Sequence, residues 1–120
     1  MNATLDPSRP RPVALVIDDE LGVRESFRLI LEDEFEVLEA EQGADGLELL
    51  RGRRVDVVLL DVRMPGAPGP TFLPQILALD EGIAVIIVTA VKDVRTAVEA
   101  IKSGAYDYVT KPFDVDEILA

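Results

Sequence analysis

Residues 13–20 read VALVIDDE, an uninterrupted apolar run that ends in three adjacent acids. Continuous runs rich in β-branched residues are typical of strands buried on both faces of a parallel sheet. Similar runs at 55–60, 83–88 and 106–110 predict three more strands, and the alternating segment 35–40 predicts an edge strand. The sequence therefore predicts five strands, the first of which ends in a cluster of acids.

The segments between these strands carry apolar residues at helical spacing. The stripe of the first predicted helix consists of Val23, Phe27, Ile30 and Leu31. Segments 44–50 and 72–79 predict two shorter helices. Pro70 would lie near the first turn of the second of these, where a missing N–H costs nothing.

A fourth helix is predicted between Asp93, a favourable N-cap residue, and Gly104, a favourable C-terminal cap. Its apolar stripe consists of Val94, Ala97, Val98 and Ile101. Strands that alternate with helices in so short a chain indicate an α/β fold, namely a doubly wound five-stranded parallel sheet with right-handed crossovers.

Composition limits the possible functions. The 120 residues, 48% of them hydrophobic, suit one soluble globular domain with a single core. With 23 acids against 12 bases and a net charge of −11, direct binding to nucleic acid is not expected. The sequence has no cysteine and no histidine, which removes thiol chemistry and a histidine base. Because no apolar run could span a membrane or serve as a signal peptide, we expect a cytoplasmic location.

Sheets of this kind place their chemistry at the carboxyl ends of the strands. The residues predicted there are Asp18, Asp19, Asp61, Thr89 and Lys111. Three carboxylates within about 4–6 Å of one another would repel by roughly 4 kcal/mol per close pair at an effective dielectric near 20. A divalent cation removes this penalty, and oxygen ligands with positions left for water favour Mg²⁺. Asp18 and Asp19 are therefore predicted ligands of Mg²⁺, one direct and one through water.

The same edge of the sheet carries the groups that phosphoryl transfer needs. Asp61 could attack a phosphorus atom and form an acyl phosphate. The metal and Lys111 would neutralise the phosphoryl oxygens, and Thr89 would donate a hydrogen bond to them. The residues themselves thus predict a phosphoacceptor aspartate.

Several short motifs resemble those of the receiver domain of two-component response regulators. They are DDE at 18–20, LLDVRMPG at 59–66, TA at 89–90 and YVTKPF at 108–113. The resemblance covers the chain from about residue 13 to its last residue. It implies a flavodoxin-like fold with strand order 2-1-3-4-5 and a phosphoprotein switch, not an enzyme, that is charged by a partner sensor histidine kinase.

The resemblance also implies roles for single residues. Asp61 matches the phosphorylated aspartate, and Lys111 matches the family lysine. Asp19, Asp61 and the backbone carbonyl of Arg63 match the direct ligands of Mg²⁺, whereas Asp18 matches the ligand that acts through water.

Thr89 and Tyr108 match the switch pair of the family. The threonine hydroxyl would move toward the phosphoryl group, and the tyrosine ring would follow into the space it leaves. The bond between Lys111 and Pro112 resembles the family's cis peptide. Phosphorylation would shift an existing equilibrium at the face of the fourth helix and fifth strand, which is the expected homodimer or output contact. The residues named for this face are Lys92, Arg95, Lys102 and Tyr108.

Domain organisation follows from the two ends of the sequence. Residues 1–12, which include three prolines, are expected to form a flexible tail, and 13–120 the receiver domain. A capping pattern at Asp114 and Glu117 starts a fifth helix that stops after about two turns, so we expect a truncated helix and a longer parent protein. The stretch at 97–113 is similar to receivers of transcriptional activators that act with sigma-54 polymerase.

Other functions were weighed against this one. A pseudo-receiver that never takes phosphate is disfavoured by the intact acids, threonine and lysine. A haloacid dehalogenase-type hydrolase needs a DxD motif, which Asp61, Val62 and Arg63 do not supply, and a cap domain. A flavin carrier would need a hydroxyl- and glycine-rich loop where this chain has DDE. Taken alone, Asp19 could cap a helix and Asp61 could belong to a turn; their joint placement favours the switch.

Two departures from the family pattern concern rates. Ala67, Pro68, Gly69 and Pro70 stand where the family often has an acid before the second glycine, and the prolines would stiffen this loop. Val91, two residues after Thr89, cannot hydrogen-bond a water for attack on the acyl phosphate.

We therefore predict slow self-dephosphorylation. A polar residue at this position, as in Val91→Asn, should shorten the half-life of the phosphorylated protein because it can orient the attacking water. Loss of the phosphoryl mass with time measures this half-life. An unchanged half-life would count against the role given to Val91.

Overall fold

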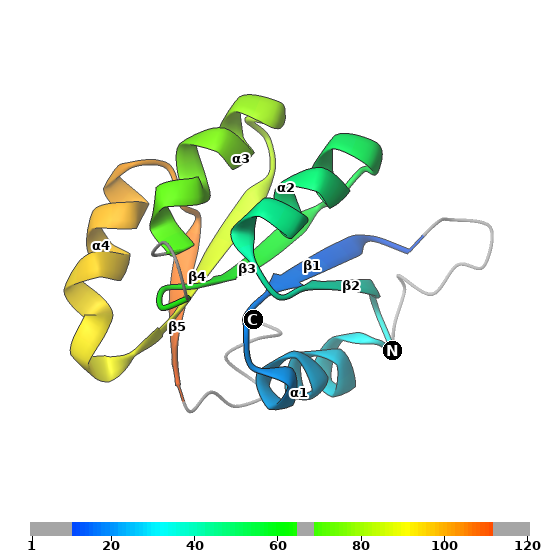
Figure 1. Cartoon of the computed structure of the whole chain (residues 1–120), viewed down its shortest axis with the longest axis horizontal. Helices are drawn as coiled ribbons and strands as arrows, with labels where there is room; N and C mark the ends of the chain where they lie inside the picture. The colour runs from blue at the N-terminus through cyan, green and yellow to red at the C-terminus, as the bar shows by residue number, and fades with distance from the viewer. Residues whose placement is uncertain (1–10, 65–68, 112–120) are drawn as a thin grey trace.

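A computed structural model describes residues 11–64 and 69–111 of the chain. Five parallel strands form one sheet in the order β2-β1-β3-β4-β5, which confirms the flavodoxin-like topology predicted from the sequence (Figure 1). The strands are β1 Val13–Ile17, β2 Glu36–Ala40, β3 Val57–Asp61, β4 Ala84–Ala90 and β5 Asp107–Lys111.

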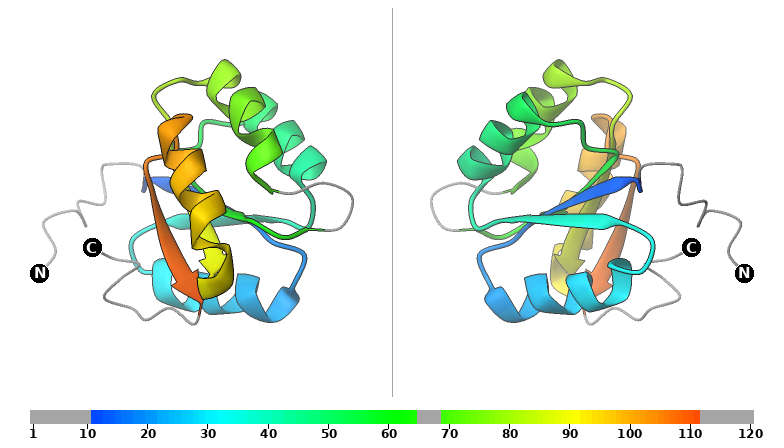
Figure 2. Two further views of the ribbon diagram at one scale, coloured as in Figure 1. Left: turned by 90° about the vertical axis from the view of Figure 1, so that its left-hand side faces the viewer. Right: turned by 90° about the vertical axis from the view of Figure 1, so that its right-hand side faces the viewer.

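Helices cover both faces of this sheet. Helices α2, α3 and α4 lie on one face, and α1 lies on the other (Figures 1 and 2). Their bounds are α1 Leu21–Leu31, α2 Gly43–Gly52, α3 Leu73–Leu79 and α4 Val94–Lys102, with short 3₁₀ helices at Gly69–Phe72 and Val91–Asp93. In the described part of the chain, no helix has the length and apolar character needed to cross a membrane. The predicted N-terminal tail (apart from residues 11 and 12), Pro112 and the predicted fifth helix lie outside the described residues.

Strand β1 explains why the apolar runs are continuous. All five of its residues are buried. Leu15 and Ile17 join the core cluster under α2, α3 and α4, whereas Ala14 and Val16 join the cluster under α1. A strand with core on both sides has no face for polar residues until it reaches the edge of the sheet. The acids at 18–20 therefore mark that edge.

Three strands extend further than their apolar runs predicted. Asp61 is the last residue of β3, Thr89 lies inside β4, and Lys111 is the last residue of β5. We expected these residues just past the strands, because the predicted strands ended at residues 60, 88 and 110. The ladder continues through them, with Asp61 opposite Val88 and Lys111 opposite Ala90. Their backbones are therefore fixed by the sheet and do not belong to loops.

Two details of the predicted helices were wrong. Val98 was placed on the inward stripe of α4 but is 38% exposed, because the helix approaches the sheet through the small residues Ala97 and Ala100. Pro70 lies in the 3₁₀ helix Gly69–Phe72, and a different proline, Pro74, occupies the first turn of α3.

The ends of α4 carry a further correction. Asp93 does occupy the N-cap position, but its side chain makes no capping hydrogen bond. Gly104 follows the C-cap residue Ser103 and has a φ of 118°, a left-handed conformation that favours glycine.

The backbone of Gly69 packs directly against the backbone of Asp61, the predicted phosphoacceptor. Its N–H donates to the carbonyl of Val62 at 2.8 Å, and a Cβ at this position would overlap the carbonyl oxygen of Asp61. Only glycine therefore lets the chain return so closely to the end of β3.

We predict that Gly69→Ala lowers the free energy of unfolding by about 1–3 kcal/mol, because the added methyl must displace backbone. Gly22→Ala is the matched control, since Gly22 lies in α1 with open space around its missing side chain. That control should be neutral or stabilising by up to about 1 kcal/mol. Urea denaturation measures both changes, and equal effects would contradict the packing argument.

Candidate functional site

The carboxyl edge of the sheet brings together residues from separate parts of the chain. Ile17 is the residue of β1 opposite Leu60 of β3, so the next residues, Asp18 and Asp61, emerge side by side. Lys111 reaches the same edge from the end of β5. These three residues were predicted to meet, and the register of the sheet does bring them together.

An ammonium group lies between two buried carboxylates. The Nζ atom of Lys111 lies 3.2 Å from Oδ1 of Asp61 and 3.4 Å from Oδ2 of Asp18. It also lies 3.8 Å from Oε1 of Glu20. Asp61 is only 4% exposed and Asp18 only 1%, so the lysine is their main shield from each other.

Burial governs the electrostatics of this cluster. It raises the pKa of Asp61 to about 6, with a further increase from the negative charge of Asp18; Lys111 and a hydrogen bond from the backbone of Arg63 oppose the increase. Burial also raises the pKa of Asp18, against a hydrogen bond from the Glu20 N–H and the charge of Lys111. For Lys111, burial lowers the pKa, but the two aspartates outweigh it and the net shift is upward. At neutral pH Asp61 is therefore ionised but unusually basic for an aspartate.

The acids that could share a metal ion lie in the turn after β1. Single oxygen atoms of Asp18, Asp19 and Glu20 all lie within 4.8 Å of one another, and Asp61 is not in this group. Three carboxylates, two of them exposed, form the all-oxygen, partly open donor set that suits Mg²⁺. Glu20 is the member that sequence reasoning did not assign, although its place directly after the two aspartates was a signal.

Arg63 contributes to the site through its backbone and binds elsewhere through its side chain. Its Nε and NH2 groups form two hydrogen bonds to the carboxylate of Asp93, at 2.6 and 2.9 Å. This pair joins the segment after β3 to the segment before α4, and it explains why Asp93 makes no capping bond.

The predicted switch residues lie on β4 and β5. Thr89 is fully buried, and its hydroxyl donates to the carbonyl of Ala90 at 3.0 Å. Tyr108 is half-buried and packs against the core cluster under α2, α3 and α4. The hydroxyl of Thr89 would have to exchange this backbone partner before it could bond to a group on Asp61.

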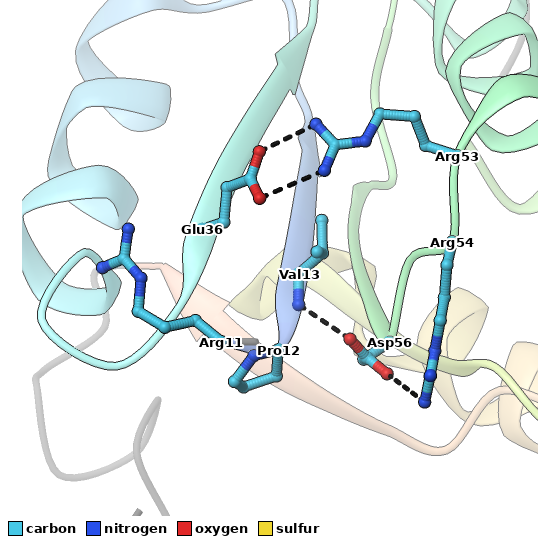
Figure 3. A pocket seen from close by; sticks show the side chains of 7 residues that line it. All are labelled: Arg11, Pro12, Val13, Glu36, Arg53, Arg54 and Asp56. Atoms are coloured by element: carbon cyan, nitrogen blue, oxygen red, sulfur yellow. Dashed lines mark hydrogen bonds and ion pairs between the residues drawn. The ribbon is translucent and has the colours of Figure 1, made fainter. Parts of the chain in front are cut away.

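A hollow lies at the opposite, amino edge of the sheet. This cavity of about 660 Å³ is lined by Arg11, Pro12, Val13, Glu36, Arg53, Arg54 and Asp56 (Figure 3). Four of its charged side chains pair with one another: Arg53 bonds to Glu36 at 2.7 and 3.1 Å, and Arg54 lies 3.4 Å from Asp56, which also accepts the N–H of Val13. These bonds fix the start of β1, and none of the residues that line the cavity is a buried reactive group.

The sequence and the fold are both similar to those of known proteins. The family model of the response regulator receiver domain matches residues 14–120. The chain is 40% identical over 111 residues to the DNA-binding transcriptional regulator NtrC of Escherichia coli K12, an alignment that covers 92% of this chain and 24% of that protein. It therefore spans about a quarter of the length of that relative.

Two other known proteins align with this chain over most of the length of both sequences. Sporulation initiation phosphotransferase F of Bacillus subtilis 168 is 35% identical over 105 residues, which are 87% of this chain and 85% of that protein. The crystal structure of the receiver domain of NtrX from Brucella abortus superposes with a TM-score of 0.84 at 32% identity, covering 88% of this chain and 91% of that one.

The raised pKa of Asp61 leads to a prediction about stability. The folded protein holds this proton more tightly than the unfolded chain, so its stability falls as pH rises from about 4 to about 6 and stays low above that range. In metal-free buffer, Asp61→Asn should therefore raise the free energy of unfolding by about 1–2 kcal/mol near pH 7.5. The gain should shrink toward zero near pH 4, as followed by urea denaturation. A gain of the same size at both pH values would contradict the electrostatic cause.

Proposed function

Because the chain belongs to the receiver domain family of two-component response regulators, we propose that it is a phosphorylation-dependent switch with Asp61 as phosphoacceptor. The observation that carries the proposal is the buried pair of carboxylates, Asp18 and Asp61, with Lys111 between them. An aspartate that is ionised, basic and fixed at the end of a strand is suited to nucleophilic attack.

The proposed reaction transfers a phosphoryl group from a phosphohistidine of a partner sensor histidine kinase. A carboxylate oxygen of Asp61 attacks phosphorus, an O–P bond forms, and the N–P bond to the donor imidazole breaks. The released nitrogen takes a proton from solvent. These 120 residues contain no histidine, so the donor lies outside them.

Lys111 has a defined part in this reaction. Its ammonium already lies 3.2 Å from Oδ1 of Asp61, so it can follow negative charge onto the phosphoryl oxygens without a long movement. The hydroxyl of Thr89 is the proposed second donor, once it leaves the carbonyl of Ala90.

We propose Mg²⁺ as the cofactor of this site. Asp19, Asp61 and the backbone carbonyl of Arg63 are the proposed direct ligands, and Asp18 is the proposed ligand through water. Bound there, the ion supplies the positive charge that phosphoryl transfer requires. The clustered oxygens of Asp18, Asp19 and Glu20 support a divalent cation at this edge. The carboxylate of Glu20 adds a further donor that could bind the ion or its waters.

Phosphorylation would then act on the surface of α4 and β5 through Thr89 and Tyr108. Moving a two-state population from 1:99 to 99:1 requires about 5.5 kcal/mol of differential stabilisation, which is plausible for one phosphoryl group contacting metal, lysine and hydroxyl together. Lys92, Arg95 and Lys102 are exposed on this surface. We propose it as the homodimer or output contact.

The wider biological role is also a proposal. The similarity to a transcriptional regulator supports control of transcription by an output domain elsewhere in a longer protein. The resemblance at 97–113 supports sigma-54 polymerase as the target of that output. The net charge of −11 supports an output that does not require this domain to bind nucleic acid. We propose that the exchange takes place in the cytoplasm and that the domain catalyses only its own phosphorylation and slow dephosphorylation.

Acetyl phosphate with Mg²⁺ tests the phosphoacceptor. The intact protein should gain the mass of one phosphoryl group, and the modified peptide should contain Asp61. Asp61→Asn should abolish the gain because the nucleophile is lost. Asp56→Asn, a change in the carboxylate just before the start of the same strand, should label as the wild type does.

Two results would contradict the proposal. Equal labelling of Asp61→Asn would move the phosphoacceptor to another residue. Absence of labelling in the folded wild type with both acetyl phosphate and a phosphorylated histidine donor would favour a pseudo-receiver.

A further inference from the structure

Arg24 is a buried charge beside the acidic turn that phosphoryl transfer does not use. It lies on α1, and only 8% of its side chain is exposed. Its NH1 group donates to the backbone carbonyl of Asp18 at 2.7 Å, its Nε donates to Oε1 of Glu39 at 3.1 Å, and its NH2 lies 3.7 Å from Oε1 of Glu41. The three nitrogens of one planar group thus reach three different residues.

The first of these contacts reaches the turn at 18–20, which carries the acidic cluster. The N–H of Asp18 donates to the carbonyl of Ala40 at 3.0 Å, and its Oδ1 accepts the N–H of Glu20 at 2.9 Å. The backbone N–H of Arg24 donates to the carbonyl of Glu20 at 3.2 Å. Arg24 therefore holds the turn twice, once through its backbone and once through its side chain.

The side-chain bond controls more than one residue because a peptide unit is planar. The carbonyl of Asp18 and the N–H of Asp19 belong to the same plane. Fixing the carbonyl therefore fixes the direction in which the chain continues to Asp19. Residues that orient the groups around a metal site typically change metal affinity by about 10- to 100-fold when they are removed.

We propose that Arg24 is a positioning residue that holds the acidic turn in the arrangement that binds Mg²⁺. This inference rests on the proposed function, since it concerns the same site. Glu39 has a supporting part: it lies on β2 opposite Val16 of β1, and its Oε1 accepts a hydrogen bond from Nε of Arg24. A lysine could preserve the charge of Arg24 but could not reproduce its fixed, planar set of donors.

Arg28 offers a matched control on the same helix. Its Nε donates to Oε2 of Glu39 at 2.8 Å, and its NH2 donates to the backbone carbonyl of Val37 at 3.0 Å. It shares with Arg24 the helix, the charge, the partner Glu39 and a bond to a backbone carbonyl. It differs in that this carbonyl lies in β2 and not in the acidic turn, and in that 43% of its side chain is exposed.

Calorimetric titration of the 120-residue protein with MgCl₂ tests the inference. Arg24→Met should raise the dissociation constant of Mg²⁺ about 10-fold or more, and Arg24→Lys should raise it by at least about 3-fold. Arg28→Met should stay within about twofold of the wild type, because the turn keeps its contacts. Circular dichroism and urea denaturation establish that each variant is folded. In metal-free samples, the amide resonances of Asp19 and Glu20 should shift in Arg24→Lys and stay in place in Arg28→Met.

The outcomes separate this inference from the proposed function. Wild-type protein that binds no Mg²⁺ would overturn both. Wild-type affinity in a folded Arg24→Met variant, or an equal loss in Arg28→Met, would overturn the positioning role and leave the metal site intact. If Arg24→Met does not fold, the comparison of Arg24→Lys with the wild type decides in the same way.

Discussion

The site depends on two carboxylates that the sheet forces into one buried place. Asp18 and Asp61 follow paired residues of the neighbouring strands β1 and β3, and both side chains are buried. Like charges so placed repel, and burial adds to the cost of ionising them. Lys111, at the end of β5, offsets this cost with its positive charge. Strand β5 is therefore part of the site as well as part of the sheet.

Parallel strands suit this arrangement because they deliver residues from distant parts of the chain to one edge. The structure goes further than that rule, since Asp61, Thr89 and Lys111 are themselves strand residues. Their backbones carry the rigidity of the ladder, so the distances among their side chains vary less than they would between loops. The close return of the chain at Gly69 adds a further constraint on the backbone of Asp61.

Much of the fold and of the site could be predicted from the sequence, because the strands and the acids that follow them are visible as local runs of residue types. Strand β1 begins and ends where its apolar run does, and the strand order follows the family resemblance. Predictions from the sequence pattern were wrong where a side chain's role depends on a contact that is distant in the sequence or on how its helix packs. Asp93 is a favourable N-cap by residue type, but Arg63 lies 30 positions away in the sequence and takes its carboxylate. Val98 has the right spacing for the core, but the alanines beside it determine how α4 is rotated.

The same distinction explains why Arg24 escaped notice in the sequence. A lone arginine on an amphipathic helix is usually a solvated residue, and only the fold places the end of β1 and the edge strand β2 around it. Its contacts also bear on what happens when charge is added to Asp61. If Asp61 takes a phosphoryl group as proposed, Lys111 is drawn toward the new oxygens and its hold on Asp18 weakens. Asp18 then still has the N–H of Glu20 on its carboxylate and the guanidinium of Arg24 on its carbonyl. The acidic turn can therefore keep its shape while the lysine changes partners, because these bonds do not involve the group that moves.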